Sequence, residues 1–257
     1  MRNLLITGGA GFIGSHFARH AMGADRGAIV TVLDLLTYAG DRSRIADLES
    51  DVRLRFVHGD VCDGPLVGSL LAGRDGAPSV DAIVHFAAET HVDRSIADPA
   101  PFVRTNVMGT HTLLEAMRAR GALAPRLLHV STDEVYGDLG PHDAPFTELR
   151  PLAPSSPYSA TKAAADGLVI AWTRTYGLRA TITRGANNYG TQQFPEKLIP
   201  VAIARAVQGD SIPLYGDGMH RREWLHVQDH SEALWTILTA ERPRHGVYNV
   251  PGEADVA

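Results

Sequence analysis

The feature that most constrains the fold is a glycine-rich turn close to the start of the chain. An apolar run from Asn3 to Thr7 is typical of a buried strand, and glycines follow it at the regular positions Gly8, Gly11 and Gly14. Glycine permits a tight turn and lets the backbone approach a pyrophosphate, which then lies at the N-terminus of the next helix. We expect that helix at residues 15–22, so the sequence predicts a dinucleotide-binding unit.

An acidic residue ends the second expected strand. This strand covers residues 29–33, and Asp34 follows it, twenty residues after Gly14. A carboxylate at this distance is expected to bind the ribose of the dinucleotide and to repel a 2′-phosphate, which favours NAD over NADP. The alternative is a plain glycine turn followed by a surface Asp. The order strand, loop, helix, strand and acid favours the cofactor site.

The rest of the chain alternates strands with helices, which predicts an α/β fold with a doubly wound, Rossmann-type parallel sheet. We expect an NAD-binding domain at residues 1–186 and a small substrate lobe, partly interleaved with it, at residues 187–257. Further strands are expected at residues 54–57, 82–86, 127–130 and 181–183, and helices at 101–120 and 158–176. Residues 184–190 are expected to form a turn. In the lobe we expect helices at 197–207 and 229–238, strands at 212–215, 222–225 and 247–250, and a turn at 216–218.

Composition excludes several classes of function. The 257 residues are 44% hydrophobic, enough for a substantial core, and the net charge of −5 offers no basic excess to attract nucleic acid or an anionic membrane. The longest apolar runs are strand-sized, and Met1 leads straight into the first strand, so we expect neither a membrane span nor a signal peptide. The single cysteine, Cys62, excludes an internal disulfide and supplies no metal-ligand set. A cytoplasmic protein without a metal is therefore expected.

Two adjacent carboxylates, Asp133 and Glu134, follow the strand at residues 127–130, with Thr132 before them. Open α/β sheets bind their ligands at the carboxyl ends of their strands. We therefore interpret these residues as candidate catalytic groups. The alternative is a cap or turn on the surface.

A tyrosine and a lysine, Tyr158 and Lys162, are spaced four apart on an expected helix and so share one face. A tyrosine hydroxyl titrates near pH 10, so it needs a neighbouring cation to act as a base at neutral pH. Lys162 is positioned to supply that charge and to hold the nicotinamide ribose. The alternative is an ordinary exposed pair. The chain contains only one other lysine, Lys197.

Other strand ends carry further candidates. Asp60, followed by Val61, is suited either to bind the adenine amino group or to cap the next helix. The small residues Ala87 and Ala88 let their strand end lie close to a cofactor. His91 is a candidate substrate contact, although a histidine in a loop is more often simply solvated.

Taken together, these motifs resemble the extended short-chain dehydrogenase/reductase family and, within it, the dTDP-glucose 4,6-dehydratases. The resemblance runs over essentially the whole chain and is carried by TGGAGFIGS at 7–15, LTYAG at 36–40, HVDRS at 91–95, STDEVYG at 131–137, YSATKAAAD at 158–166, NNYG at 187–190, FPEKLIP at 194–200 and LYGDG at 214–218. The acidic pair after Thr132 discriminates best, because related sugar epimerases lack it.

The resemblance implies NAD as cofactor and a nucleotide sugar, dTDP-glucose, as substrate. Besides the residues named above, the resemblance implies that the NAD site includes Phe12, Ile13, Thr37, Thr105 and Asn188. It implies that the substrate site includes Asn187, Lys197, Leu198, Pro213, Tyr215, Arg222 and Asn249, with Arg221 as a substitute for Arg222. It also implies a homodimer built from the helices that start near Pro101 and Tyr158.

The implied reaction removes water from the sugar. Tyr158 would take the proton of the C4 hydroxyl, Thr132 would bind the C4 oxygen, Glu134 would take the C5 proton and Asp133 would protonate the leaving C6 hydroxyl. Asp133 must then stay protonated, which requires its pKa to rise by about 3 units through burial and the neighbouring like charge. The competing hypotheses are a sibling epimerase or reductase and a non-catalytic NAD-binding protein.

Two departures from the family pattern stand out. Leu35 occupies a position where the family usually has lysine, which predicts weaker cofactor binding. The chain also stops at Ala257, whereas family members continue for several dozen residues. We expect a truncated gene, a fragment or a shortened variant with an incomplete substrate lobe.

Overall fold

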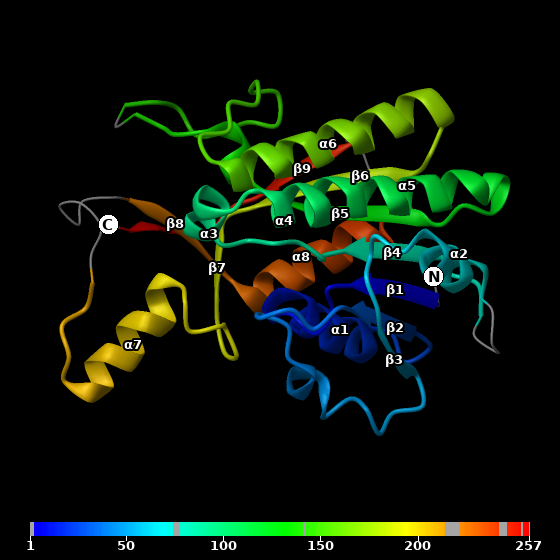
Figure 1. Ribbon diagram of the computed structural model, residues 1–257, viewed down its shortest axis with the longest axis horizontal. Coiled ribbons are helices and arrows are strands. Elements are labelled where there is room, and N and C mark those ends of the chain that lie inside the picture. Colours follow the sequence, from blue (N-terminus) through cyan, green and yellow to red (C-terminus); the bar gives the residue numbers. More distant parts are fainter. Residues whose placement is uncertain are drawn as a thin grey trace.

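The computed structural model describes residues 3–73, 78–140, 142–213, 221–241, 246–252 and 254–256, the last three as backbone only. Its main feature is a seven-stranded parallel sheet ordered β3-β2-β1-β4-β5-β6-β9 (Figure 1). The strands are β1 (Asn3–Thr7), β2 (Ile29–Asp34), β3 (Leu54–His58), β4 (Ala82–His85), β5 (Arg126–Thr132), β6 (Ala180–Gly185) and β9 (Val247–Val250). The predicted Rossmann-type fold is confirmed.

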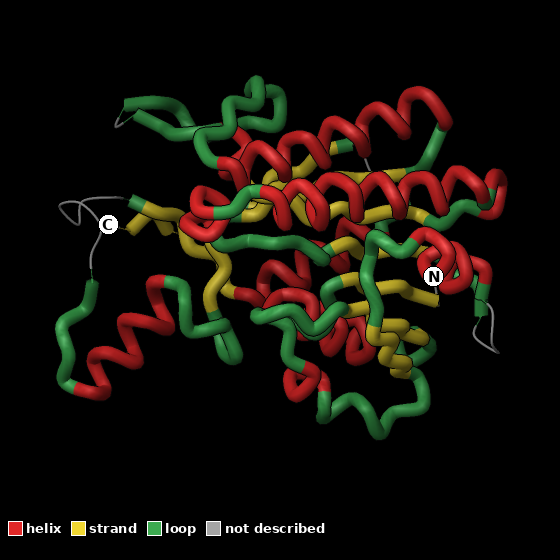
Figure 2. Tube along the Cα trace, in the orientation of Figure 1, coloured by secondary structure: helices red, strands yellow, loops and turns green. Residues whose placement is uncertain are grey.

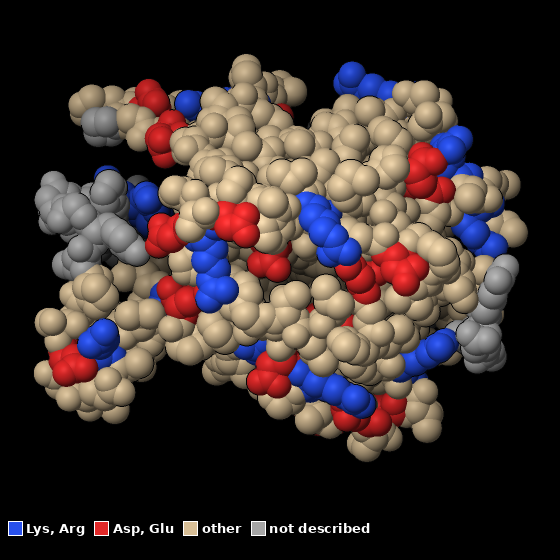
Figure 3. Space-filling view, viewed as in Figure 1, with Lys and Arg blue, Asp and Glu red and all other residues tan. Residues whose placement is uncertain are grey.

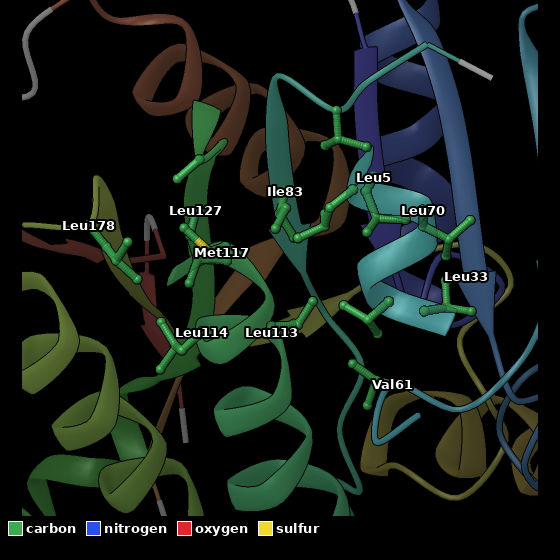
Figure 4. Packing of buried hydrophobic residues seen from close by; sticks show 14 of the residues in the cluster. Leu5, Leu33, Val61, Leu70, Ile83, Leu113, Leu114, Met117, Leu127 and Leu178 are labelled. Carbon is green, nitrogen blue, oxygen red and sulfur yellow. The ribbon is translucent and has the colours of Figure 1, made fainter. Parts of the chain in front are cut away.

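Helices cover both faces of this sheet (Figure 2). They are α1 (Phe12–Ala24), α2 (Gly64–Ala72), α5 (Gly109–Ala119), α6 (Pro157–Tyr176) and α8 (Val227–Thr239). Because side chains alternate along a strand, Leu4 and Ile6 pack towards α1 and α8, while Leu5 packs towards α2, α5 and α6. Figure 4 shows the second of these layers, where Leu113, Leu114 and Met117 of α5 meet Leu127 of β5.

The glycine turn determines where the first helix begins. The helix predicted at residues 15–22 extends over Phe12–Ala24, with Gly11 as its N-cap residue. It therefore begins inside the glycine motif, and its first backbone N–H groups point at the turn. The helix predicted from Tyr158 begins one residue earlier, at Pro157, where a missing N–H costs nothing.

The long helix predicted at residues 101–120 is interrupted by a wider turn. It consists of α4 (Ala100–Phe102), a π-helical segment (Val103–Met108) and α5. Such segments are rare and are frequent at functional sites. Asn106 lies in this segment, and its buried amide bonds both backbone groups of Glu89 and the Thr161 hydroxyl.

A second, smaller sheet follows β6 almost at once. Its order is β10-β8-β7, with β7 (Asn187–Tyr189) parallel to β8 (Arg222–His226) and β10 (Ala254–Val256) antiparallel to β8. The prediction of a turn at residues 184–190 was wrong, because the chain stays extended to pair with β8. The largely exposed helix α7 (Leu198–Gln208) lies on the same side of the molecule in Figure 1.

Later segments return to the main sheet. Helix α8 packs against α1, and β9 pairs with β6. Part of residues 187–257 therefore belongs to the domain built on the seven-stranded sheet rather than to a separate lobe. The division at residue 186 stays a prediction. Ile212 and Pro213 form no strand, while the rest of the strand predicted at 212–215 and the turn predicted at 216–218 lie outside the described residues.

The surface carries mixed charge. Acidic and basic side chains are interspersed on the face shown in Figure 3. Within the described ranges, no helix combines the length and the apolar character needed to cross a bilayer.

Two short elements complete the path to the site. Helix α3 (Val92–Ala97) follows β4, and a single turn, Asp133–Tyr136, follows β5. Two further single turns lie at Arg42–Ile45 and Gly121–Leu123.

Candidate active site

A cavity of about 1140 Å³ runs along the carboxyl ends of the strands. It lies where the strand order reverses between β1 and β4, the place at which doubly wound sheets bind ligands. All of the residues predicted to bind the cofactor line it, as do four of the predicted catalytic residues, Thr132, Glu134, Tyr158 and Lys162. Predicted substrate residues in the lining are Asn187, Lys197, Leu198, Pro213 and Arg222.

The glycine turn forms one end of this cavity. Gly8 has a φ of 71°, and a Cβ there would lie 2.6 Å from the backbone nitrogen of Ala87. A Cβ on Gly14 would collide with the carbonyl oxygen of Gly8. The turn, the first turn of α1 and the end of β4 therefore pack backbone against backbone. The cradle that remains suits a pyrophosphate group at a helix N-terminus.

Asp34 is held rigidly beside the turn. Its Oδ2 accepts the backbone N–H of Ala10 at 2.9 Å and its Oδ1 accepts that of Leu36 at 2.8 Å. Each oxygen keeps a further lone pair for a ribose hydroxyl. Leu35, the departure from the family pattern, lies beside Asp34 in the lining and is 41% exposed.

Asp60 does not cap a helix, so that alternative was wrong. Asp63 is the N-cap residue of α2, accepting the N–H of Leu66 at 3.0 Å. Asp60 instead accepts the N–H of Cys62 at 2.8 Å and pairs with Arg104 at 2.6 Å. Burial works to raise the pKa of Asp60, but these contacts outweigh it and lower the value. The carboxylate stays charged at the cavity wall.

The two adjacent carboxyl groups have different surroundings. Thr132 ends β5, and its hydroxyl accepts the N–H of Glu134 at 3.2 Å and donates to Asp133 Oδ1 at 3.3 Å. Glu134 lines the cavity, whereas Asp133 lies against Thr132, outside the lining. Burial and the charge of Glu134 raise the pKa of Asp133 to about 6, the predicted direction. Burial also raises the pKa of Glu134, opposed by Lys197 and Arg222.

Tyr158 and Lys162 are both buried at the start of α6, and both line the cavity. Ser156 and Ser159 form a capping box that begins the helix, and Ser95 accepts the backbone N–H of Tyr158 at 3.1 Å. The helix start, and with it the phenol, is therefore positioned from two sides.

The predicted effect of Lys162 on the pKa of Tyr158 is not the main one in this structure. Burial and the charges of Glu134 and Asp133 raise the pKa of Tyr158, opposed by the Thr132 hydroxyl. Lys162 Nζ donates to the carbonyl of Val130 at 2.8 Å, and burial lowers its pKa to about 8. The dominant influences, burial and two nearby carboxyls, come from the tertiary structure.

Two residues predicted at the substrate lie outside the lining. His91 is the N-cap residue of α3, with Nδ1 3.5 Å from the N–H of Arg94, and its Nε2 lies 3.7 Å from Glu196. Asn249 accepts the Tyr136 hydroxyl at 2.8 Å and donates to the Phe146 carbonyl at 3.1 Å. Both side chains are used for local structure. Tyr215 lies outside the described residues.

Apart from Lys197, the chain segment at residues 190–197 was not predicted as part of the wall. His16 bonds the carbonyl of Thr191 at 3.0 Å, Arg44 that of Gln192 at 3.1 Å, and Tyr38 donates to Glu196 at 3.3 Å. Lys197 donates to the carbonyl of Thr90 at 3.1 Å. These partners lie far apart in sequence, so no local signal could have identified the contacts.

His230 is a further lining residue that the sequence did not indicate. It is buried on α8, and its Nδ1 lies 2.8 Å from the side-chain oxygen of Asn188. Burial lowers its pKa to about 4, so it is neutral at pH 7. A histidine inside a helical pattern carries no signal that separates such a role from core packing.

The same combination of fold and site occurs in known proteins. The family model described as GDP-mannose 4,6 dehydratase matches residues 5–256. The dTDP-glucose 4,6-dehydratase of Mycolicibacterium smegmatis is 54% identical over 237 residues, which cover 92% of this chain and 68% of the relative.

Solved structures of related enzymes have the same fold. The dTDP-glucose 4,6-dehydratase of Streptomyces venezuelae, a double mutant with NAD and DAU bound, is 48% identical with a TM-score of 0.91, covering 100% of this chain and 77% of that one. A UDP-glucuronic acid 4-epimerase of Bacillus cereus, in complex with UDP-glucuronic acid and NAD, has a TM-score of 0.89 at 26% identity, covering 99% and 79%. Fold alone therefore does not separate dehydratases from epimerases, whereas the level of sequence identity does.

The chain belongs to the dTDP-glucose 4,6-dehydratases, a family of hydro-lyases within the group that the GDP-mannose 4,6 dehydratase model describes.

Proposed function

We propose that this protein converts dTDP-glucose, with NAD as a recycled cofactor, into the 4-keto-6-deoxy sugar by removing water. One observation carries the proposal: Thr132 and Glu134 line the same cavity as Tyr158 and Lys162. A base for the C4 hydroxyl and a base for C5 are thus available at one sugar ring.

The residues of the cavity suit NAD. The glycine cradle leaves room for a pyrophosphate, and Asp34 offers free lone pairs where a ribose would lie. Asp60 and Val61 would lie at the adenine, and Tyr158 and Lys162 at the nicotinamide ribose. NAD bound there would supply the hydride chemistry, with C4 of the sugar as hydride donor and C6 as the final acceptor, and its positive ring would favour an ionised phenol nearby.

Tyr158 takes the proton of the C4 hydroxyl. Its buried position raises the pKa of the phenol, so a cation must come close before it can act as a base. Lys162 is the cation of this chain one helical turn away. Thr132 donates a hydrogen bond to Asp133 and lines the same cavity as Tyr158 and Lys162. Its role is to hold the C4 oxygen.

Once C4 is a ketone, the C5 proton becomes acidic because the carbanion is an enolate. Glu134 takes this proton, and its pKa, raised by burial, brings it closer to the working pH of a general base. Asp133 protonates the C6 hydroxyl, which leaves as water. Its pKa of about 6 keeps a fraction of the group protonated near neutral pH. The two carboxyls titrate as a coupled pair.

The diphosphate of the substrate is held by cations. Lys197 and Arg222 line the cavity near Glu134, and Asn187 lies in the same wall. A guanidinium offers a planar fork of donors that matches phosphate oxygens. These roles are proposals for the individual residues.

One experiment separates this function from its rivals. Protein loaded with NAD is incubated with dTDP-glucose deuterated at C4, and the product is analysed by mass spectrometry and NMR. A dehydratase loses one water and moves the deuterium to C6. An epimerase keeps the water and returns the label to C4. A non-catalytic binder retains NAD and leaves the sugar unchanged, and either of these last outcomes would exclude the proposal.

We also infer a homodimer built from the helical segments that start near Pro101 and Tyr158, and a cytoplasmic location. Val103 and Met108, on the π-helical segment before α5, are 48% and 49% exposed and offer apolar surface. The lone Cys62 is consistent with a reducing compartment. A solution-mass measurement should give twice the chain mass of 27.6 kDa.

A further inference from the structure

A chain of buried polar groups lies behind the cavity wall. Arg184 of β6 donates from Nε to Asp166 Oδ2 at 2.9 Å and from Nη1 to the hydroxyl of Tyr136 at 2.7 Å. His129 of β5 lies 3.5 Å from the other oxygen of Asp166. Asp166 and His129 are 0% exposed and Arg184 is 3% exposed. The ion pair between Arg184 and Asp166 is therefore enclosed in the core.

Asp166 and Lys162 share the same face of α6. They are four residues apart, so one helical turn separates them, and both are buried. Lys162 Nζ donates to the carbonyl of Val130, which is a neutral acceptor. A buried ammonium held by a carbonyl alone is poorly compensated, because burial disfavours the charged form unless an opposite charge is near.

The other titratable neighbours do not supply that charge. Asp133 and Glu134 act on the pKa of Tyr158, whereas the charge that works to raise the pKa of Lys162 is that of Asp166. His85 of β4 and His129 both have a lowered pKa, caused first by burial, so they are neutral at pH 7. Arg184 is a cation and Tyr158 has a raised pKa, so neither offers a negative charge. Burial works to raise the pKa of Asp166, but His129 and Arg184 outweigh it and keep the carboxylate ionised.

We propose that Asp166 is a positioning residue that keeps Lys162 as an ammonium at the base of the cavity, and that Arg184 fixes the carboxylate for this purpose. The importance of Lys162 rests on the proposed function, whereas its charge state does not. Asp166 acts through Lys162 and is not among the residues that line the cavity.

The test uses the scarcity of lysine in this chain. Only Lys162 and Lys197 are present, so protein labelled with ¹³C at lysine Cε gives two signals, and the variant Lys197→Arg assigns them. The signal of Lys162 is followed from pH 6 to 10 in the native chain and in Asp166→Asn. We expect the midpoint to fall by about 1 unit or more in the variant, because a neighbouring opposite charge shifts a pKa by about that amount. A midpoint of the native chain well below 7, or an unchanged midpoint in the variant, would overturn the proposal.

Tyr136→Phe is the matched control. It breaks the same polar chain at the Arg184 contact but leaves the charge of Asp166 in place. Its Lys162 midpoint should match that of the native chain. Equal shifts in both variants would mean that loosening of the core, and not the charge of Asp166, controls Lys162, and the proposal would fail.

Asp166→Asn leaves the Arg184 guanidinium buried without its counter-ion, so this variant has a folding risk. If it does not fold, the same titration of Lys162 is carried out on the double variant Asp166→Asn with Arg184→Met. Replacing a buried ion pair by neutral groups of similar volume is often tolerated. The midpoint of Lys162 should again fall, and an unchanged value would overturn the proposal.

Activity gives a second, separate readout. If the protein dehydrates dTDP-glucose, the alkaline limb of kcat moves to lower pH in Asp166→Asn, with NAD still bound. A purely structural role would lower kcat equally at all pH values. If the native chain shows no turnover, the proposed function fails while the NMR titration still tests Asp166.

Discussion

Asp133 and Glu134 are neighbours in the chain, but their side chains have different surroundings. Asp133 lies against the Thr132 hydroxyl at 3.3 Å, outside the cavity lining, while Glu134 lines the cavity and is influenced by Lys197 and Arg222. Two carboxyls with different environments are suited to separate acid and base roles. This asymmetry leads to a direct test of which group does what.

Glu134→Gln and Asp133→Asn should each lower kcat for dehydration by about 10²–10⁴-fold, the usual contribution of a proton-transfer group. In D₂O the two variants differ. Without a base at C5, Glu134→Gln should fail to introduce solvent deuterium at C5 of the sugar. Asp133→Asn should still exchange this position, because it lacks only the acid for C6. The reverse pattern, read by NMR, would exchange the two assigned roles.

The pH dependence of stability tests the environment of Asp133. Its pKa rises from 3.8 to about 6, so the folded state binds more protons than the unfolded state between these values. Stability from this group is therefore lost as pH rises from about 4 to 6. Asp133→Asn cannot ionise, and it should exceed the native chain in unfolding free energy by a margin about 1 kcal/mol larger at pH 8 than at pH 5.

Urea unfolding at the two pH values measures this margin. Asp41 supplies a control with a flat response, because hydrogen bonds from Ser43 lower its pKa below 3.8 and it is ionised in both states at pH 5 and at pH 8. The stability difference between Asp41→Asn and the native chain should therefore be nearly the same at the two pH values. A margin for Asp133→Asn that does not grow with pH would contradict the raised pKa.

Two glycines of α1 form a matched pair for the cofactor cradle. A Cβ at Gly14 meets the backbone of Gly8 and Gly9, whereas a Cβ at Gly23 has nothing within 4 Å. Gly14→Ala should therefore cost about 2 kcal/mol or more and abolish NAD binding, since backbone must move. Gly23→Ala should raise stability by up to about 1 kcal/mol, because alanine is the better helix former. Thermal unfolding and calorimetric titration with NAD check both, and a tolerated Gly14→Ala would contradict the close packing.

Asp34→Asn tests the predicted cofactor preference. The amide can accept only one of the two backbone N–H groups that Asp34 now satisfies, and it carries no charge. NAD should bind about 10-fold or more weakly, in line with an unpaired buried donor costing about 1–3 kcal/mol. The preference for NAD over NADP should also narrow, because the repulsion of a 2′-phosphate is gone. Titration with both dinucleotides measures this, and an unchanged ratio would remove Asp34 from the specificity argument.

Much of the cofactor site follows from local sequence. The turn at Gly8 and the acid at Asp34 are separated by one βα unit, and each such unit places its loop at the same edge of a parallel sheet. Periodicity then identifies which strand ends share that edge. This is why strand ends as distant as Asp60 and Ala87 could be assigned to one cavity before its shape was known, and why the fold class was predicted correctly. Thr105 and Asn188 were assigned from the family resemblance instead.

The parts that failed depend on contacts between distant segments. The extended chain at Asn187–Tyr189 forms a strand only because β8 pairs with it. The side chain of Asn249, predicted at the substrate, is hydrogen-bonded to the Tyr136 hydroxyl and the Phe146 carbonyl instead. The pKa of Tyr158 is set by burial and by carboxyls more than twenty residues earlier, and not mainly by Lys162 one turn away.

The sequence by itself therefore determined the βα order, the dinucleotide turn and the chemical groups at the strand ends, because these depend on neighbours a few residues apart. Only the tertiary structure decided which carboxyl faces the cavity, which charges stay ionised and which chain segments form the wall. Those properties depend on burial and on long-range pairing, which local patterns do not encode.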